Sequence, residues 1–328
     1  MLPLEYPKVA GLSFIAMVLF VAVFAIAIRR VPKRRPFGPL GWLGLSAYCI
    51  CSVLLASPVP KPAILGALAW TGIILTVDSA VHALRGRSLI RSSPAAFAWL
   101  AVLSIFLWLP FEWYNLRLGG WYRSGLPGGP IRYLMLGWFS ACIWPALFEM
   151  ADLLAALVAP SAPRQARAVT ARPGPAATVV ALGAACLAAP VVVPRLDLGE
   201  YMLPLAGVGF LLLLDPLNAV AGRPSLWGDW RSGNRVRIVS TTLSGVFCGL
   251  LADCLNHGAG AKWHSIYRAG PDLGSLEVPL VGYLILPLFA LQALAMHAFA
   301  VGMLGLPQAE VSTLAAADSA TGLSDVSG

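Results

Sequence analysis

Long apolar windows constrain this chain more than any other feature. Segments of about 20 apolar residues, the length with which an α-helix crosses roughly 30 Å of hydrocarbon, can be placed about nine times along it. Only 12% of the 328 residues are charged, whereas a soluble domain has about 25%. The sequence therefore predicts an all-α, polytopic integral membrane protein with about nine transmembrane helices. We expect them at about 9–28, 38–57, 63–83, 97–116, 133–158, 175–194, 201–220, 236–256 and 278–304.

The basic residues predict how the chain is oriented. If the segment "RRVPKRR" after the first helix is cytoplasmic, then 15 of the 23 lysines and arginines fall on that side. This bias agrees with the positive-inside rule. We therefore interpret the net charge of +8 as a mark of sidedness and not of nucleic-acid binding. The expected location is a bacterial inner (plasma) membrane, with the N-terminus outside and the C-terminus in the cytoplasm.

Two parts of the chain resemble each other. Asp78 follows an apolar run and precedes a Gly-Arg and a Ser-Leu pair, and Asp215 does the same. Further on, three more residues of the first part correspond in order to three of the second: Glu112, Asn115 and Trp121 to Asp253, Asn256 and Trp263. Unlike residue types in a conserved order indicate an internal duplication.

The duplication predicts the division of the chain. An odd number of linking helices would leave the two units parallel, related by an axis along the membrane normal. An equivalent description would add the second helix and give one helix plus two units of four. The expected parts are N-terminal helices with a basic cytoplasmic loop (1–62), a first three-helix repeat (63–160), a linking helix (161–198), a second three-helix repeat (199–305) and a disordered cytoplasmic tail (306–328).

Acidic residues within apolar segments are the first candidates for function. An ionisable group in hydrocarbon costs several kcal/mol unless it is paired or faces water. Glu112 and Asp253 occur at the outer ends of corresponding helices, and Glu149 lies deeper in the fifth helix. We predict that these three carboxyl groups supply or relay protons. The alternative is structural: Glu112 and Asp253 would each bind the backbone of the loop that follows, and Glu149 would make structural hydrogen bonds.

Polar and aromatic residues near these acids are the predicted substrate-binding groups. On a helix, residues three apart share a face, so Asn115 and Asn256 are expected to orient Glu112 and Asp253. The expected lining of the substrate pocket consists of Trp121, Trp263, Tyr122, Tyr267 and His257. The aromatic residues also fit a simple aromatic belt at the membrane interface.

Metal and cofactor sites are not expected. His257 and His264 could join Glu112 and Asp253 in a metal site on the outer face, but two histidines at this spacing are a weak signal. The six cysteines fall in or beside apolar segments, with no spacing typical of a zinc site. We therefore predict neither a metal nor a cofactor.

The second unit resembles a known family. Ala252-Asp253, Gly260-Ala261-Lys262-Trp263, Tyr267, Pro271, Leu273-Gly274 and Val278-Pro279-Leu280 follow one another in this order. The pattern weakly resembles the three-helix repeat of heterodimer-type lycopene cyclases of carotenoid biosynthesis. The resemblance implies parallel three-helix units and acid-initiated cyclisation of a polyene. This chain lacks the family's Pro-Leu-Glu-Glu motif, because Val281-Gly282 follows Leu280.

These observations predict a membrane-embedded enzyme that acts on a lipid or isoprenoid-like substrate by carboxylate acid/base chemistry. Its expected partners are membrane lipids and an apolar small molecule. Two alternatives remain open. The parallel repeats also suit a secondary transporter of a small solute or lipid, and the basic loops suit a non-catalytic membrane scaffold that binds anionic lipid or partners.

Overall fold

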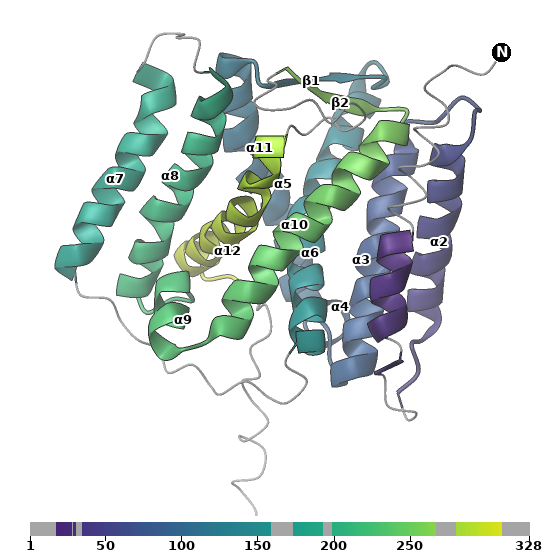
Figure 1. Cartoon of the computed structure of the whole chain (residues 1–328), viewed down its shortest axis with the longest axis horizontal. Coiled ribbons are helices and arrows are strands. Elements are labelled where there is room, and N and C mark those ends of the chain that lie inside the picture. Colours follow the sequence, from purple (N-terminus) through teal and green to yellow (C-terminus); the bar gives the residue numbers. More distant parts are fainter. Residues whose placement is uncertain are drawn as a thin grey trace, which may run out of the picture.

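The computed structural model describes residues 18–27, 29–30, 35–158, 173–192, 199–266 and 280–309. These residues form helices and one two-stranded ribbon (Figure 1). The elements are a short helix Val18–Ala27, then α2 (Pro39–Ala56), α3 (Ile64–Arg85), α4 (Leu89–Ser92), α5 (Pro94–Leu118), β1 (Trp121–Ser124), α6 (Pro130–Val158), α7 (Pro173–Val192), α8 (Gly199–Val220), α9 (Leu226–Ser232), α10 (Arg235–Gly258), β2 (Lys262–Ser265), α11 (Leu280–Tyr283) and α12 (Ile285–Leu304).

The described helices confirm an all-α integral membrane protein, with fewer spans than expected. Seven helices of the described part are long and apolar enough to cross a bilayer: α2, α3, α5, α6, α8, α10 and α12. The expected count of about nine is not matched, because the first and sixth apolar segments contribute only the shorter apolar stretches Val18–Ala27 and Ala176–Val192, the second of which lies within α7. The expected start of the first helix lies outside the described residues, as does most of the expected disordered tail.

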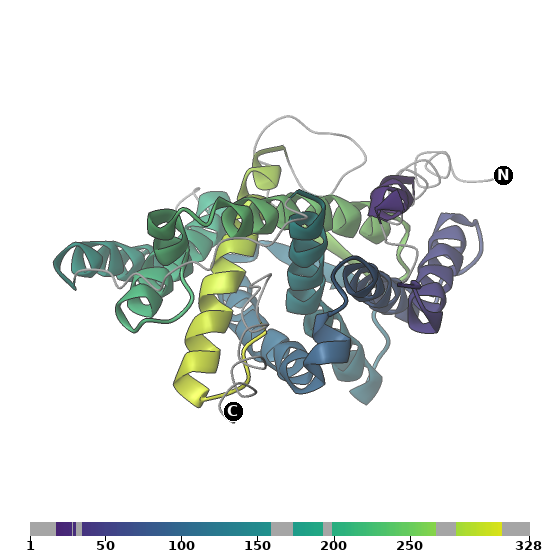
Figure 2. The ribbon, with the colours of Figure 1, turned by 90° about the horizontal axis from the view of Figure 1, so that it is seen from below.

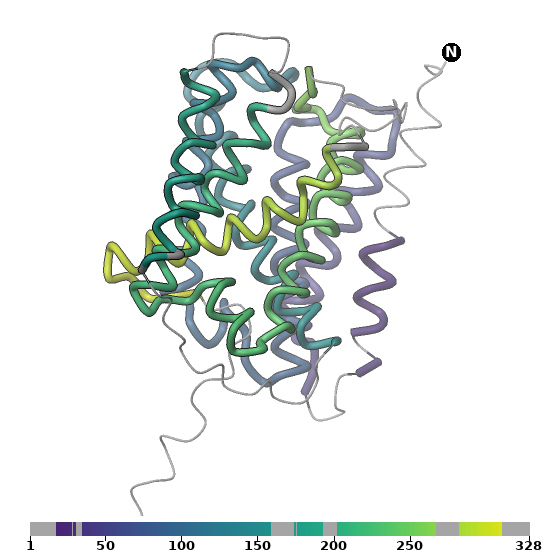
Figure 3. The backbone as a smooth tube through the Cα atoms, turned by 60° about the vertical axis from the view of Figure 1, so that its left-hand side comes forward, coloured from purple at the N-terminus to yellow at the C-terminus, as the bar shows by residue number. Residues whose placement is uncertain are grey.

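The helices pack in the same order in two halves of the molecule. In the first half α2 packs on α3, and both α3 and α5 pack on α6. In the second half α7 packs on α8, and both α8 and α10 pack on α12. Contacts between α6 and α10 join the halves, while α2 and α7 lie at opposite edges of the bundle (Figures 1 and 2). The smooth trace in Figure 3 shows α7 and α8 running side by side. Thus α7, expected to be a link between repeats, packs along α8 as part of the second half.

Glycines allow close approach in both edge pairs. A Cβ atom on Gly72 would lie 2.7 Å from the carbonyl oxygen of Gly44, where α2 meets α3. In the α7–α8 pair, a Cβ atom on Gly183 would lie 2.4 Å from the backbone nitrogen of Leu213. Small residues at such contacts are typical of membrane helices, which associate through close packing because lipid tails are as apolar as their side chains.

The two ends of the bundle differ. The ribbon of β1 and β2 lies at one end, here called the ribbon end, and α4 and α9 lie at the other, here called the α4/α9 end (Figure 1). The strands pair antiparallel, with Trp121 opposite Ser265 and Arg123 opposite Trp263. Strands that come from different halves therefore form one sheet, which connects the halves at the ribbon end.

Two aspartates fix the backbone at the α4/α9 end. Asp78 accepts a hydrogen bond from the backbone N–H of Ile90 in α4 at 2.9 Å. Asp215 accepts from the backbone N–H groups of Leu226 and Trp227 in α9, at 2.6 and 2.9 Å. The N–H groups in the first turn of a helix have no carbonyl acceptor within that helix. Here each carboxylate accepts hydrogen bonds from such N–H groups. Both aspartates thus hold a short helix against the bundle.

Candidate functional site

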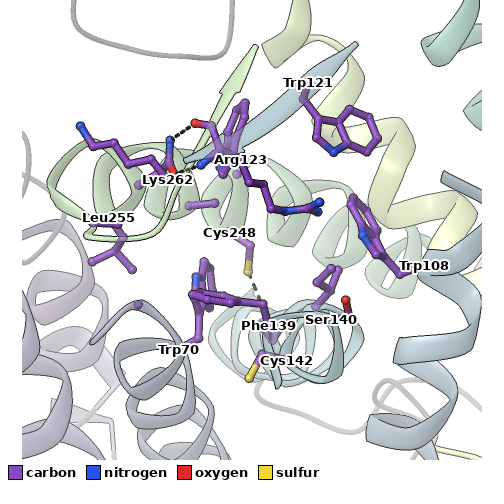
Figure 4. A pocket seen from close by; sticks show the side chains of 18 of the residues that line it. Trp70, Trp108, Trp121, Arg123, Phe139, Ser140, Cys142, Cys248, Leu255 and Lys262 are labelled. Carbon is purple, nitrogen blue, oxygen red and sulfur yellow. Dashed lines mark hydrogen bonds between the residues drawn. The ribbon is translucent and has the colours of Figure 1, made fainter. Parts of the chain in front are cut away.

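A cavity of about 450 Å³ lies beneath the ribbon, between the two halves (Figure 4). Its walls come from α3, α5, α6, α10 and α12, and the ribbon with its flanking residues forms the roof. Most of the lining side chains are apolar. The aromatic ones are Trp70, Trp108, Trp121, Phe139, Trp263 and Phe289.

Aromatic packing gives one wall of the cavity a fixed shape. The ring of Trp108 in α5 lies 5.9 Å from that of Trp121 in β1, measured between centroids. It also lies 6.1 Å from the ring of Phe289 in α12, in an edge-to-face arrangement. These are distances at which aromatic rings attract one another. Because the three rings come from three elements, the wall is held from both halves of the molecule.

The alternation of β1 decides which of its side chains face the cavity. Trp121 and Arg123 line it, as successive odd positions of a strand share one face. Tyr122 lies on the other face, where it is 54% exposed and its ring stacks on His264 at 4.8 Å. Tyr122 therefore does not line the cavity, although the sequence analysis placed it in the substrate pocket.

Asn115 and Asn256 hold the roof by the same arrangement of hydrogen bonds. The side-chain amide of Asn115 donates to the carbonyl oxygen of Trp121 at 2.9 Å and accepts from its N–H at 2.8 Å. Asn256 makes the same pair with Trp263, at 2.8 and 2.9 Å. Each asparagine thus binds strand backbone, where the sequence analysis expected it to orient a carboxylate.

Glu112 does not itself line the cavity, but it bonds to two residues that do, Trp108 and Arg123. Its Oε1 accepts from the indole N–H of Trp108 at 2.6 Å. It also pairs with Arg123 through both carboxylate oxygens, with a distance of 3.1 Å from Nη1 to Oε2. Figure 4 shows the Arg123 side chain reaching from the ribbon into the middle of the cavity, beside Trp108. The roof therefore combines a guanidinium group inside the cavity with a carboxylate beside it.

The other two predicted acids lie elsewhere. Asp253 is fully buried and accepts a hydrogen bond from the hydroxyl group of Tyr283 at 2.6 Å. Glu149 is 1% exposed and lies beside Asp78, toward the α4/α9 end. Neither residue lines the cavity, so the three carboxyl groups do not converge on it.

Of the remaining residues predicted to bind substrate, some line the cavity and others do not. Trp121, Trp263 and Asn256 line the cavity. His257 lies one turn after Asp253 on α10 and is not part of the lining, while Tyr267 lies outside the described residues. Within the described ranges no group of three or more His, Cys, Asp or Glu side chains is arranged to hold a metal ion. The alternative metal site around Glu112 and Asp253 is therefore not assembled there.

Arg123 is the main residue that the sequence analysis missed. Arg123 lies two residues after Trp121, and residues two apart in a strand share one face. Expecting a short strand here would therefore have placed Arg123 on the same face as Trp121. Two lysines add positive charge at the ribbon end. Lys262 lines the cavity. Lys61 lies close enough to Lys262 for that charge, together with burial, to lower the pKa of Lys61. The ribbon end thus offers cations close to an apolar space.

Comparison with protein-family models, with curated proteins and with solved structures gives no match to this chain.

Proposed function

We propose that this protein is a membrane-embedded enzyme that acts on a lipid or isoprenoid-like substrate, whose apolar part occupies the cavity beneath the ribbon. One observation carries the proposal: an aromatic-lined cavity of about 450 Å³ contains the guanidinium group of Arg123. Apolar walls with a few placed polar groups are typical of small-molecule sites. An amphiphilic substrate would place its chain against the tryptophans and its polar group at Arg123.

The acid/base chemistry is assigned to Glu112. Glu112 pairs with Arg123, so its carboxylate lies close to a substrate bound at Arg123 and can act on that substrate as a general base. The indole N–H of Trp108 fixes the position of one carboxylate oxygen. In this proposal Asp253 and Glu149 take no part in the reaction at Glu112.

The proposal includes the arrangement of the chain in the membrane. Support for two parallel copies of one unit comes from the matching helix contacts and from the matching bonds of Asn115 and Asn256. With α2 and α7 included, the units are α2–α6 and α7–α12. The positive-inside rule favours a cytoplasmic α4/α9 end, since Arg87, Arg91 and Arg231 lie there. The N-terminus would then be outside, in a bacterial inner membrane.

Glu112→Gln tests the enzymatic role. Glutamine keeps an oxygen that can accept from Trp108 and Arg123, but it cannot act as a base at neutral pH. We expect a product that depends on the wild-type protein to fall by a factor of about 10² to 10⁴, the usual contribution of general acid–base catalysis. The measurement is mass spectrometry of total lipid extracts from host membranes that contain the wild type, the variant or neither.

The same experiment separates the alternatives. An unchanged lipid profile for Glu112→Gln, at equal abundance of the protein, would rule out Glu112 as the catalytic base. Uptake of lipid or solute into liposomes without a covalent product would identify a transporter. If binding of anionic vesicles is the only activity of the wild type, the protein is a scaffold.

A further inference from the structure

A second polar cluster lies between α3 and α6, away from the cavity and toward the α4/α9 end. It contains Asp78 in α3 and Glu149 and Asp152 in α6. The three side chains belong to residues that are 0%, 1% and 8% exposed. The proposed reaction at Glu112 uses none of them, so the cluster needs a separate explanation.

The partners of the three carboxyl groups differ. Asp78 accepts the hydrogen bond from the backbone N–H of Ile90, at 2.9 Å through Oδ1. Asp152 interacts electrostatically with the guanidinium group of Arg85. Neither oxygen of Glu149 receives a hydrogen bond from a donor among the described residues. Glu149 instead lies within hydrogen-bonding reach of the Asp78 carboxyl group.

Two buried carboxyl groups in contact cannot both be ionised at low cost. Like charges at this separation repel strongly in a medium of low dielectric constant, and two acceptors form a hydrogen bond only when a proton lies between them. In the aspartic proteases, two adjacent carboxyl groups share one proton for this reason. One of the two groups here must therefore carry a proton.

The surrounding charges decide which group carries it. Arg91 in α4 and His82 in α3 interact with Asp78, and Asp152 in α6 interacts with Glu149. Further out, Arg85 in α3 interacts with Asp152, and Arg35 before α2 interacts with His82. The positive charge of Arg91 favours the ionised form of Asp78. The hydrogen bond from the backbone N–H of Ile90 favours the same form. Glu149 has the two negative neighbours Asp78 and Asp152. The proton therefore belongs on Glu149.

We propose that Glu149 and Asp78 form a proton-binding site, in which Glu149 carries one exchangeable proton and donates it in a hydrogen bond to ionised Asp78. The site is separate from Glu112, and its ligand is the proton itself. On loss of that proton to water, two adjacent carboxylates would push α3 and α6 apart. Ala146 and Leu147, less than one turn earlier on α6, line the cavity. A displacement of α6 on loss of the proton from Glu149 would therefore also move residues that line the cavity.

Infrared spectroscopy of the purified full-length protein tests this proposal. A protonated carboxyl group has a C=O stretching band distinct from that of a carboxylate, and the band shifts on transfer to D₂O when the proton exchanges. We expect Glu149→Gln to remove one such band at neutral pH. Its amide N–H₂ can still donate to Asp78, so the variant should fold. Asp152→Asn is the matched control and should leave the band in place, because Asp152 interacts with the guanidinium group of Arg85 and is not the group proposed to carry the proton.

Asp78→Asn provides a second, independent result. Glu149 would remain protonated, but its hydrogen-bond partner would change from a carboxylate to an amide, so the band should persist at a shifted frequency. Wild-type and Glu149→Gln spectra that are identical in the protonated-carboxyl region would overturn the proposal. A band that does not shift in Asp78→Asn would overturn the shared hydrogen bond. Neither result depends on the reaction proposed for Glu112.

Discussion

Gly245→Ala is expected to destabilise the protein by about 3 kcal/mol, the upper part of the usual range for overpacking. Gly245 lies where α10 crosses α12, and an added Cβ atom would be 2.3 Å from the carbonyl oxygen of Leu286 and 2.8 Å from the Cβ atom of Ala290. A backbone oxygen cannot rotate away as a side chain can. The two helices would therefore have to separate. Thermal unfolding of the purified protein in detergent micelles measures the loss.

Gly137→Ala is the matched control. Gly137 is also within a helix, α6, but a Cβ atom there would meet no heavy atom within 4 Å. Alanine is favoured over glycine in a helix by roughly 0.5–1 kcal/mol, so this variant should be as stable as the wild type or slightly more so. If Gly245→Ala unfolds at the same temperature as Gly137→Ala, the close crossing of α10 and α12 is wrong.

Trp144→Ala has an expected cost of about 3–5 kcal/mol, as for other buried Trp→Ala substitutions. Trp144 in α6 is fully buried, and its indole N–H donates to the carbonyl oxygen of Ala293 in α12 at 2.9 Å. Its ring also lies 5.9 Å from that of Phe289. Alanine would leave a void between the two halves and remove the hydrogen bond. The unfolding temperature and the fraction of monodisperse protein report the effect.

Trp99→Ala separates this packing effect from a general effect of losing a tryptophan. Trp99 in α5 is 41% exposed on the surface of the bundle. Substitutions at exposed positions usually change stability by less than about 0.5 kcal/mol. Equal losses for Trp144→Ala and Trp99→Ala would contradict the central position of Trp144 between α6 and α12.

Much of the fold follows from local properties of the sequence. Hydropathy predicted the seven long helices of the described part, since hydrocarbon requires a helix of a certain length with its backbone satisfied internally. The repeated residue order also drew attention to Asn115 with Trp121 and to Asn256 with Trp263, and the structure brings each pair into contact. Order along the chain was informative here because the members of each pair are close in sequence.

The contacts of the acidic residues could not be predicted in the same way. Helical periodicity shows which face a carboxylate occupies, but its partner comes from another element: Arg123 from the ribbon for Glu112, and Tyr283 from α11 for Asp253. The ribbon itself is four residues per strand, too short for a clear alternation. Asp78 and Glu149 lie on separate helices, so their contact depends on how α3 packs against α6.

The central claim is that the cavity beneath the ribbon holds an apolar molecule. Ala252→Trp tests it most directly, because Ala252 lines the cavity and an indole there would fill part of the space. Leu116→Trp is the control, since Leu116 is 84% exposed and the added indole would point away from the bundle. The measurement is mass spectrometry of lipids that remain bound after purification in the same detergent.

We predict that the wild type and Leu116→Trp retain the same lipid or isoprenoid in a fixed molar ratio and that Ala252→Trp loses it. Equal retention of that molecule by Ala252→Trp, in a variant that is folded and monodisperse, would show that the cavity is not its binding site.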